Sequence, residues 1–295
     1  MIKRIGIAII ALLGLASCEK AVSFIPRNAG PVVVIEATIE NDQPPIVILS
    51  RSMSYFSEIT PDSLANSFIR NAEIYVSNGT KTHRLKEYAF PADNGYIVYY
   101  YSTDSASLAT AFEGEFSKSY SLQVKVDGKE YTATTTIPAL TKTLDSIWWK
   151  PAPNNPDSEK VIIMARTTDP PGYGNYIRYF TKSNAELFYP GLTSVFDDQI
   201  VDGKTYEVQV EHGVDRNHSI DLEEYAFFNR GEVVTVKFCN IDKATFDFWR
   251  TMEYNYSSIG NPFSSPTKVL SNIKGGGLGY FGGYAVQYTT LVIPQ

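Results

Sequence analysis

The chain has 295 residues and a formal net charge of −6 at pH 7, and hydrophobic residues make up 43% of it. This length fits one large or two ordinary domains, with enough apolar residues for a core. Nucleic acid and anionic lipid headgroups bind positively charged surfaces, so neither is expected as a partner. The 20 tyrosines, together with Phe, Val and Thr, favour strands over helices.

The N-terminus has the layout of a secretory signal. Residues 1–4 are short and basic, and the apolar run from Ile5 to Leu15 is too short to span a bilayer, which needs roughly 20 apolar residues. The sequence LASC at residues 15–18 resembles the bacterial lipobox. The resemblance implies cleavage before Cys18 and lipid on that residue. The alternative is an ordinary secreted protein with a chance cysteine.

Residues 1–17 are therefore predicted to be a lipoprotein signal peptide. Residues 18–30, which lack periodicity, are predicted to be a tether between the membrane and the fold. Two or three acyl chains hold a protein stably on a membrane, since each buried methylene contributes about 0.8 kcal/mol. No later segment has 18 or more consecutive apolar residues, so we expect a lipid-anchored protein that does not span the bilayer.

Residues 31–140 are predicted to form an immunoglobulin-like antiparallel β-sandwich, because short β-rich segments alternate with turns. The sequence NDQP at residues 41–44 separates the first two segments. The dipeptides at 78–79 (NG) and 127–128 (DG) supply the positive φ values of tight hairpin turns. The expected strands are VVVIEATIE, PIVILSRS, YIVYYY and the two arms around each of those dipeptides.

Residues 141–295 are predicted to form a second antiparallel β domain. The proline-rich stretch from Pro138 to Pro156 marks the junction, although it contains two tryptophans that we expect to be packed. Turns are expected at residues 202–203 and 230–231. The strand-like segments are VIIMARTTD, NYIRYFTK, TYEVQVEH, EVVTVKFCN and, at the end, YAVQYTTLVIP.

One helix is expected near residues 242–256. Asp242 is a suitable N-cap, because its side chain can accept hydrogen bonds from the first free backbone amides. Apolar residues follow at three- and four-residue spacing and would form a face that docks on the sheet. They are Phe246, Phe248, Trp249, Met252 and Tyr256.

A family resemblance is carried mainly by residues 261–284, NPFSSPTKVLSNIKGGGLGYFGGY. Together with the lipobox and residues 33–52, VVIEATIENDQPPIVILSRS, this stretch resembles domain-of-unknown-function family 4249, a family of Bacteroidota lipoproteins. Such genes commonly lie beside those for TonB-dependent outer-membrane receptors. The resemblance therefore implies an accessory lipoprotein of the outer membrane, and it brings no catalytic residue.

The glycines at 275–277 do not form a phosphate loop. Lys274 precedes them, no Lys-Ser or Lys-Thr follows, and a strand comes next where a helix would be needed. We expect a sharp turn packed by the aromatic residues Tyr280 and Phe281. The alternative is a docking loop that exposes both rings.

Motifs for enzymatic chemistry are missing from the sequence. There is no GxSxG elbow and no HExxH helix. The histidines are His83, His212 and His218, and none has the spacing of a zinc site. His83 is expected to be exposed on the polar side of a hairpin. We therefore assign no catalytic, cofactor-binding or metal-binding residue and expect no cofactor.

The segment 215–224 is the best metal candidate, because its oxygen donors alternate as at the start of a calcium loop. However, Ile220 stands where the turn needs glycine, and Ala226 replaces the bidentate glutamate. A solvated acidic loop is the favoured interpretation, and a calcium site is the alternative. The adjacent acids at 197–198 and 223–224 would point to opposite faces of a strand.

Cys239 is expected to be a buried structural thiol, since it ends a strand-like run and has no disulfide partner once Cys18 carries lipid. The triplets DSL, DSA and DSI around Ser63, Ser105 and Ser146 resemble the Bacteroidota O-glycosylation signal, a short motif that also recurs by chance.

Two groups of aromatic residues, Tyr99–Tyr101 and Trp148–Trp149, could form a platform on which sugars stack. The favoured interpretation is that they cover the edges of the core.

The function expected from these features is non-enzymatic. We expect a lipid-anchored cell-envelope protein, an accessory subunit of a TonB-dependent outer-membrane receptor or nutrient-uptake complex. One alternative is a free-standing surface lipoprotein that binds glycan or peptide. The other is a hydrolase, which would need a polar pocket with facing carboxylates or a Ser-His pair.

Overall fold

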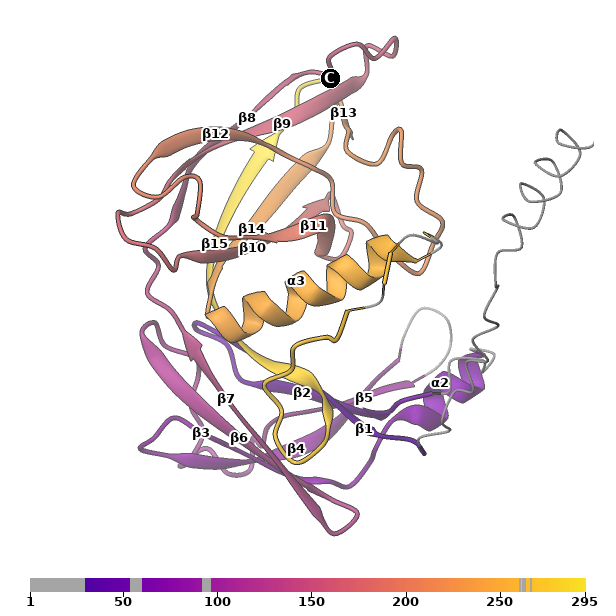
Figure 1. The fold of residues 1–295 in the computed structure, drawn as a ribbon, viewed down its shortest axis with the longest axis vertical. Helices are drawn as coiled ribbons and strands as arrows, with labels where there is room; N and C mark the ends of the chain where they lie inside the picture. The colour runs from indigo at the N-terminus through magenta and orange to yellow at the C-terminus, as the bar shows by residue number, and fades with distance from the viewer. Residues whose placement is uncertain (1–29, 54–59, 92–96, 260, 262–263, 266) are drawn as a thin grey trace, which may run out of the picture. The chain divides into compact units, whose positions relative to one another are not determined.

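The computed structural model describes residues 30–53, 60–91, 97–259, 261, 264–265 and 267–295 (Figure 1). The predicted signal peptide, the lipidation site Cys18 and nearly all of the tether lie outside these residues. Contacts divide the chain into two units, Met1–Gly30 and Pro31–Gln295, and the second unit contains all the helices and strands described here. No helix in the described part of the chain is long and apolar enough to cross a membrane.

The unit is built mainly from antiparallel strands, as the composition predicts. The helices are α2 (Pro61–Ser67) and α3 (Lys243–Ser258). The strands are β1 (Val33–Glu40), β2 (Ile46–Arg51), β3 (Glu73–Ser77), β4 (Thr82–Pro91), β5 (Ile97–Thr103), β6 (Lys118–Val126), β7 (Lys129–Ile137), β8 (Thr143–Pro151), β9 (Lys160–Thr168), β10 (Tyr176–Ser183), β11 (Tyr189–Phe196), β12 (Thr205–Val210), β13 (Phe228–Asn229), β14 (Val233–Ile241) and β15 (Leu278–Val292).

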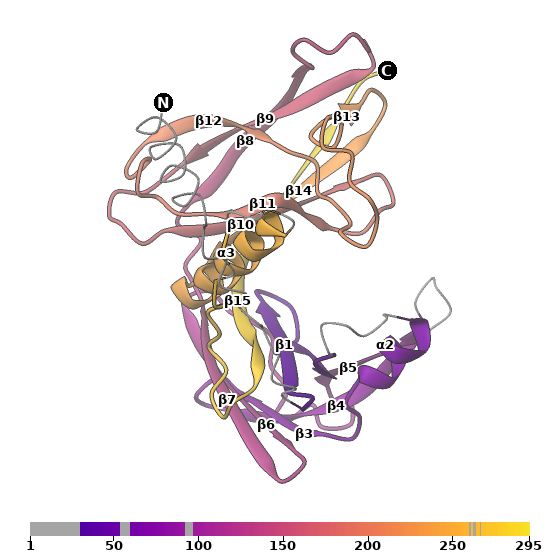
Figure 2. The same ribbon diagram turned by 45° about the vertical axis from the view of Figure 1, so that its right-hand side comes forward.

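The first half of the unit is the predicted antiparallel sandwich (Figure 2). One layer contains β1, β2 and β5, and the other contains β3, β6 and β7. β4 pairs with β5 through one part of its length and with β3 through the other, so it joins the two layers. Alternate residues of these strands point inward and are buried. They include Ile35, Ala37, Ile39, Val47, Leu49, Ile74, Val76, Leu122, Val124 and Ala133.

The second half also has two layers, which confirms a second antiparallel β structure. β11, β10, β14 and the end of β15 lie in one layer, and β12, β9, β13 and β8 lie in the other. Figure 1 shows the two layers above the helix α3. The buried residues between them include Leu144, Val161, Ile163, Ala165, Ile177, Val210, Phe228, Val234, Val236 and Phe238.

The long C-terminal strand β15 belongs to both halves. Residues 278–284 pair in parallel with β1, and residues 284–292 pair antiparallel with β14. The parallel pairing is a difference from the purely antiparallel architecture expected. Pairing with both neighbours makes one continuous hydrogen-bonded sheet that runs from β11 at one edge to β7 at the other.

Helix α3 confirms the predicted helix and its cap. A side-chain oxygen of Asp242 accepts the backbone N–H of Thr245 at 2.8 Å. The other oxygen accepts the hydroxyl of Thr135 and the N–H of Thr136, both at 3.0 Å, so the cap also ties the helix to β7. The helix packs against β10, β11 and β15.

The predicted apolar face of α3 is wrong at its last turn. Tyr256 is half exposed, whereas Glu253 is buried. The carboxylate of Glu253 accepts the backbone N–H and the hydroxyl of Ser194, and that hydroxyl also accepts Nε of Arg178 at 3.1 Å. A buried polar group is tolerated when it is hydrogen-bonded in this way. The polar network therefore decides which side of the last turn faces the sheet.

Four elements differ from the prediction. Strand β8 lies inside the proline-rich stretch that was expected to mark the junction, and it pairs with β9, whereas β13 has only two residues. Strand β11 begins Tyr189-Pro190-Gly191 and has a register shift opposite β10, so it lacks the alternation on which strand prediction depends. Helix α2 is short, but it begins with a reciprocal capping box between Thr60 and Ser63 and has a proline at its first position.

The turn predicted at Asn78-Gly79 is wider than expected, because only Gly79 has positive φ and residues 78–81 separate β3 from β4. The turn predicted at residues 127–128 is confirmed. In the hairpin between β6 and β7, Asp127 and Gly128 both have positive φ. Gly275 also has positive φ, and a side chain there would overlap the carbonyl oxygen of Glu130 on β7. The ring beside these glycines is that of Tyr131, so the expectation that Tyr280 and Phe281 pack the turn is wrong. Tyr280 is buried under α3 and Phe281 lies in the sandwich core, because consecutive strand residues face opposite sides.

Candidate functional site

A cavity of about 890 Å³ lies between the two layers of the second half. Its walls come from β9 and β12 on one side and from β10, β11 and β14 on the other, with α3 contributing at one end. Protein interiors are close-packed and have few voids larger than a water molecule. Ligand pockets usually measure roughly 300–1,000 Å³, so this cavity has the size of a binding site.

The deep walls of the cavity are apolar. Inward-facing positions repeat every second residue along the strands, and several are occupied by small residues such as Ala165 and Val236. Small side chains leave space between the layers that larger ones would fill. The buried apolar residues of the wall are Leu144, Ala165, Ile177, Val195, Val210, Val236, Phe238 and Phe246.

The mouth of the cavity carries exposed apolar residues beside the exposed polar residues Thr193, Gln209 and Arg250. Phe196, Ile200 and Val208 line it and are 42%, 85% and 43% exposed. Contiguous apolar surface that faces solvent is uncommon on soluble proteins and marks interaction sites. Apolar residues therefore continue from the interior to the surface at this point.

A small polar group lies among the apolar walls. Tyr225 donates its phenolic O–H to Oε2 of Glu211 at 3.1 Å, and Tyr179 lines the same cavity. Burial raises the pKa of the Tyr179 phenol, and the negative charge of Glu211 raises it further. The pKa of Tyr225 is raised mainly by burial and further by the same carboxylate. Both phenols therefore stay protonated at neutral pH and can donate hydrogen bonds.

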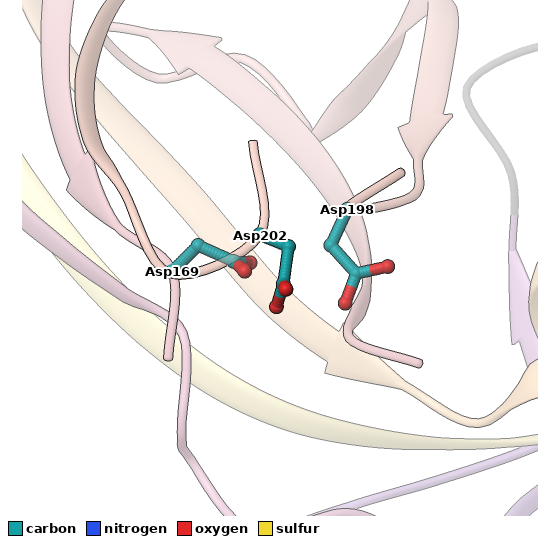
Figure 3. A group of neighbouring side chains, drawn as sticks. All are labelled: Asp169, Asp198 and Asp202. Atoms are coloured by element: carbon teal, nitrogen blue, oxygen red, sulfur yellow. The ribbon is translucent and has the colours of Figure 1, made fainter. Parts of the chain in front are cut away.

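Three aspartates from two loops, Asp169, Asp198 and Asp202, lie close together (Figure 3). Oxygens of Asp169, Asp198 and Asp202 lie within 4.8 Å of one another, which makes these the candidate metal ligands among the described residues. The ammonium of Lys142 lies 2.9 Å from Oδ1 of Asp169, and neither side chain is exposed. This ammonium already supplies a positive charge to the cluster, so the geometry does not require a metal ion.

The remaining oxygens of this cluster hold two loops together. Oδ2 of Asp198 accepts the N–H groups of Gly174 and Asn175, both at 2.8 Å, and Oδ1 of Asp202 accepts that of Gly172 at 2.6 Å. Burial opposes ionisation of Asp198, but these hydrogen bonds prevail and lower its pKa. The aspartates therefore join the β9–β10 loop to the β11–β12 loop at one end of the cavity. Sequence reasoning missed this arrangement.

The expectation that His83 is exposed is wrong. Only 1% of the surface of His83 is accessible. Nε2 accepts the backbone N–H of Asp104 at 2.9 Å, and Nδ1 lies 2.9 Å from the hydroxyl of Thr110. Burial lowers its pKa. This neutral imidazole holds the turn after β5 and does not lie at the cavity.

A Ser-His pair does form, between residues far apart in sequence. The hydroxyl oxygen of Ser183 lies 3.2 Å from Nε2 of His212. Ser183 is only 3% exposed, however, and it donates its hydroxyl proton to Glu232 at 3.0 Å. Neither residue lines the cavity. A nucleophile that is buried and does not line the cavity is not placed to attack a substrate held there.

The acidic loop 215–224 is mostly exposed. The carboxylate of Asp215 accepts the N–H groups of Asn217 and lies 3.0 Å from Nδ1 of His218, and Asp221 accepts the N–H of Glu223. The hydrogen bond from the Asn217 backbone is the largest cause of the lowered pKa of Asp215. These oxygens face protein N–H donors, which supports the solvated-loop interpretation.

The two residues of each adjacent acidic pair, 197–198 and 223–224, have different surroundings. Asp197 lines the cavity, whereas Asp198 is buried in the aspartate cluster. Glu223 is exposed, and Glu224 lies 3.5 Å from the ammonium of Lys160.

The aromatic residues of both groups contact other parts of the protein. Tyr101 is buried and donates to the carbonyl of Ile69, and Tyr100 stacks on Tyr88. Trp148 and Trp149 are half buried, and the guanidinium of Arg230 lies 4.8 Å from the centre of the Trp149 ring. This arrangement supports the core-edge interpretation.

The remaining predicted residues lie at different depths. Cys239 is free and fully buried, which confirms the structural thiol. Ser105 and Ser146 are exposed, whereas Ser63 is half buried and holds the cap of α2.

Comparison with protein families gives one match. The family model described as "Domain of unknown function (DUF4249)" matches residues 21–290, which is most of the chain. No curated protein matches the chain.

Proposed function

The chain belongs to the DUF4249 family, and from its cavity we propose that it is a non-enzymatic binding protein of the cell envelope that captures a small, largely apolar ligand. The observation that carries the proposal is the cavity of about 890 Å³, whose deep walls are apolar and whose mouth carries exposed apolar residues. Sites of this kind take up most of a ligand's surface and orient it through a few polar groups.

The N-terminus supports placement at a membrane. Lipid on Cys18, which the LASC motif implies, would hold the cavity beside the bilayer, in the outer membrane on its periplasmic or outer face. A protein anchored there and able to hold an apolar molecule fits an accessory subunit of a TonB-dependent receptor or nutrient-uptake complex. Affinity purification from gently solubilised outer membranes tests this role, and recovery of the protein alone would count against a complex.

The geometry favours this function over the two alternatives. Glycan sites are typically polar and present free aromatic faces, whereas Tyr100 and Trp149 are engaged by other side chains. A hydrolase would need its nucleophile at a pocket, and Ser183 is buried away from the cavity.

A fluorescence titration tests the cavity. The neutral dye N-phenyl-1-naphthylamine brightens in apolar surroundings, and we expect saturable binding with a stoichiometry of one. Val208→Asp places a charge at the mouth and should weaken binding by about tenfold or more, since a bound apolar ligand would cover this charge and remove it from water. Val233→Asp is the matched control, because Val233 is 40% exposed on a strand and does not line the cavity.

Binding that is absent, or that both substitutions weaken equally, would contradict the proposal. Circular dichroism and thermal unfolding of each variant establish that a loss of binding does not reflect loss of the fold.

A further inference from the structure

We infer that the ligand is an aliphatic molecule carrying a protonated amine, held by the carboxylate of Glu211 while its chain lies along the apolar wall. This inference rests on the proposed binding function and adds the chemical class of the ligand.

The position of Glu211 is the first reason. It directly follows β12 and lines the cavity, as does Tyr225, its side-chain hydrogen-bond partner. Tyr225, which precedes β13, donates to one of its oxygens, Oε2, at 3.1 Å. Across the described residues, the other oxygen, Oε1, has no hydrogen-bond partner and the carboxylate has no ion pair. A hydrogen-bond acceptor is thus left free for a ligand.

The apolar surroundings are the second reason. Val210 precedes Glu211 on the wall and is buried, as is Tyr179. A carboxylate that is half removed from water gains from a cationic partner, because attraction between charges strengthens as the local dielectric falls. Hydrogen bonds between an ammonium and a carboxylate are also stronger than those between neutral groups. An amine would therefore bind more tightly here than an alcohol of the same length.

The balance of charge is the third reason. The charged residues that line the cavity are Asp197, Glu211 and Arg250, so two negative charges meet one positive charge and the net charge is −1. The guanidinium of Arg250 is exposed and lies 3.6 Å from Asp247 on its own helix, so its charge is partly neutralised there. An anionic headgroup would meet repulsion from Glu211 without a free cation inside the cavity.

Displacement of the bound dye tests the inference. Dodecylammonium, dodecanol and dodecanoate have the same chain and differ in headgroup, and each is titrated below its micelle concentration at neutral pH. We expect dodecylammonium to displace the dye at a concentration about tenfold lower than dodecanoate, with dodecanol between them. Equal potency of amine and carboxylate, or a preference for carboxylate, would overturn the inference.

Glu211→Gln keeps an oxygen that can accept from Tyr225 but removes the charge. We expect it to reduce the amine-to-carboxylate preference to less than about threefold. The matched control is Glu207→Gln, because Glu207 lies on the same strand, does not line the cavity and pairs with Arg166 at 2.8 Å. It should keep the preference of the unaltered protein. A preference that survives Glu211→Gln would reject Glu211 as the anchor.

The outcomes separate this inference from the function on which it depends. If the dye does not bind, the proposed function fails. If the dye binds but the three headgroups compete equally, the binding function stands and only the assignment of the amine fails. The ligand series on the unaltered protein decides between these outcomes even if a variant does not fold.

Discussion

The ammonium of Lys142 and the carboxylate of Asp169 form an ion pair at 2.9 Å in which neither side chain is exposed to solvent. Lys142 precedes β8 and Asp169 follows β9, two strands that pair with each other. The same lysine lies 5.4 Å from the centre of the Tyr206 ring, and Tyr206 lines the cavity. The ion pair therefore supports the end of the cavity where the two loops meet.

Replacing Lys142 with methionine should destabilise the protein strongly. The substitution keeps most of the volume but leaves Asp169 charged and unpaired, which typically costs about 3–5 kcal/mol. The free energy of unfolding in urea measures the effect. Arg51→Ala is the control, because Arg51 pairs with Asp127 at the surface and such pairs contribute about 0–1 kcal/mol. Similar losses for both variants would contradict the assigned role of the buried pair.

Asp242→Ala should reduce stability through two losses at once. It removes the N-cap of α3, which is worth about 1–2 kcal/mol, and it removes the acceptor for Thr135 and Thr136 on β7. Asp242→Asn keeps an oxygen that can cap the helix and should recover part of the loss. Chemical denaturation of the three proteins gives the comparison. Equal stability of the alanine and asparagine variants would show that the cap contributes little.

Gly279→Ala should also destabilise the protein. Gly279 has φ of 98°, and an added Cβ would overlap the carbonyl oxygen of Ile35 where β15 pairs with β1. The backbone conformation alone costs a residue with a side chain about 1–3 kcal/mol. Gly128→Ala is the control, since Gly128 also has positive φ but open space around it. A smaller loss at Gly279 than at Gly128, measured by thermal unfolding, would contradict the close approach.

The Cys239 thiol should make stability depend on pH in the alkaline range. Burial raises its pKa from 9.0 to about 12, so the folded state favours the protonated thiol. Its contribution is complete below about pH 9 and is lost as the pH rises toward about 12, because the unfolded chain releases its proton first. The difference in unfolding free energy between the unaltered protein and Cys239→Ala should therefore shrink as the pH rises from about 9 toward about 12. A constant difference would mean that the thiol does not titrate as expected.

Cys18→Ala should release the protein from the membrane. The acyl chains supply about 0.8 kcal/mol of membrane affinity for each buried methylene, and the substitution removes the residue that accepts them. Cell fractionation and immunoblotting measure the shift from the membrane pellet to the soluble fraction. Ser17→Ala preserves a small residue before the cysteine and should stay in the pellet. A Cys18→Ala protein that still pellets would contradict lipid anchoring at this position.

Local features of the fold could be predicted because their causes lie within a few residues. The cap at Asp242 involves Thr245 three residues later, and the turn at Asp127-Gly128 depends on two positive φ values. The buried strands can be recognised by the alternation of buried and more exposed residues, as in β1 and β6. Strand β11 could not be found in this way, because Pro190, Gly191 and a register shift interrupt its pattern.

The burial of polar side chains could not be predicted, since it depends on partners that are distant in sequence. His83 sits in a hairpin whose pattern indicates exposure, but Asp104 and Thr110 cover it. Glu253 lies on a helix and is buried because Ser194 of β11 supplies its hydrogen-bond donors.

The amino-acid sequence alone determined the all-β class, the helix at its cap, the glycine-rich turn and the family. It also carries the lipidation motif at Cys18. Each of these follows from the amino-acid composition, from the spacing of residues or from a short contiguous stretch. Only the tertiary structure decided that β15 pairs with β1 in parallel, that the sandwich layers leave a cavity, and that Glu211, Tyr225 and Tyr179 meet in it. The physical reason is that a cavity is space left between layers, and its size depends on side chains from strands that the sequence does not place side by side.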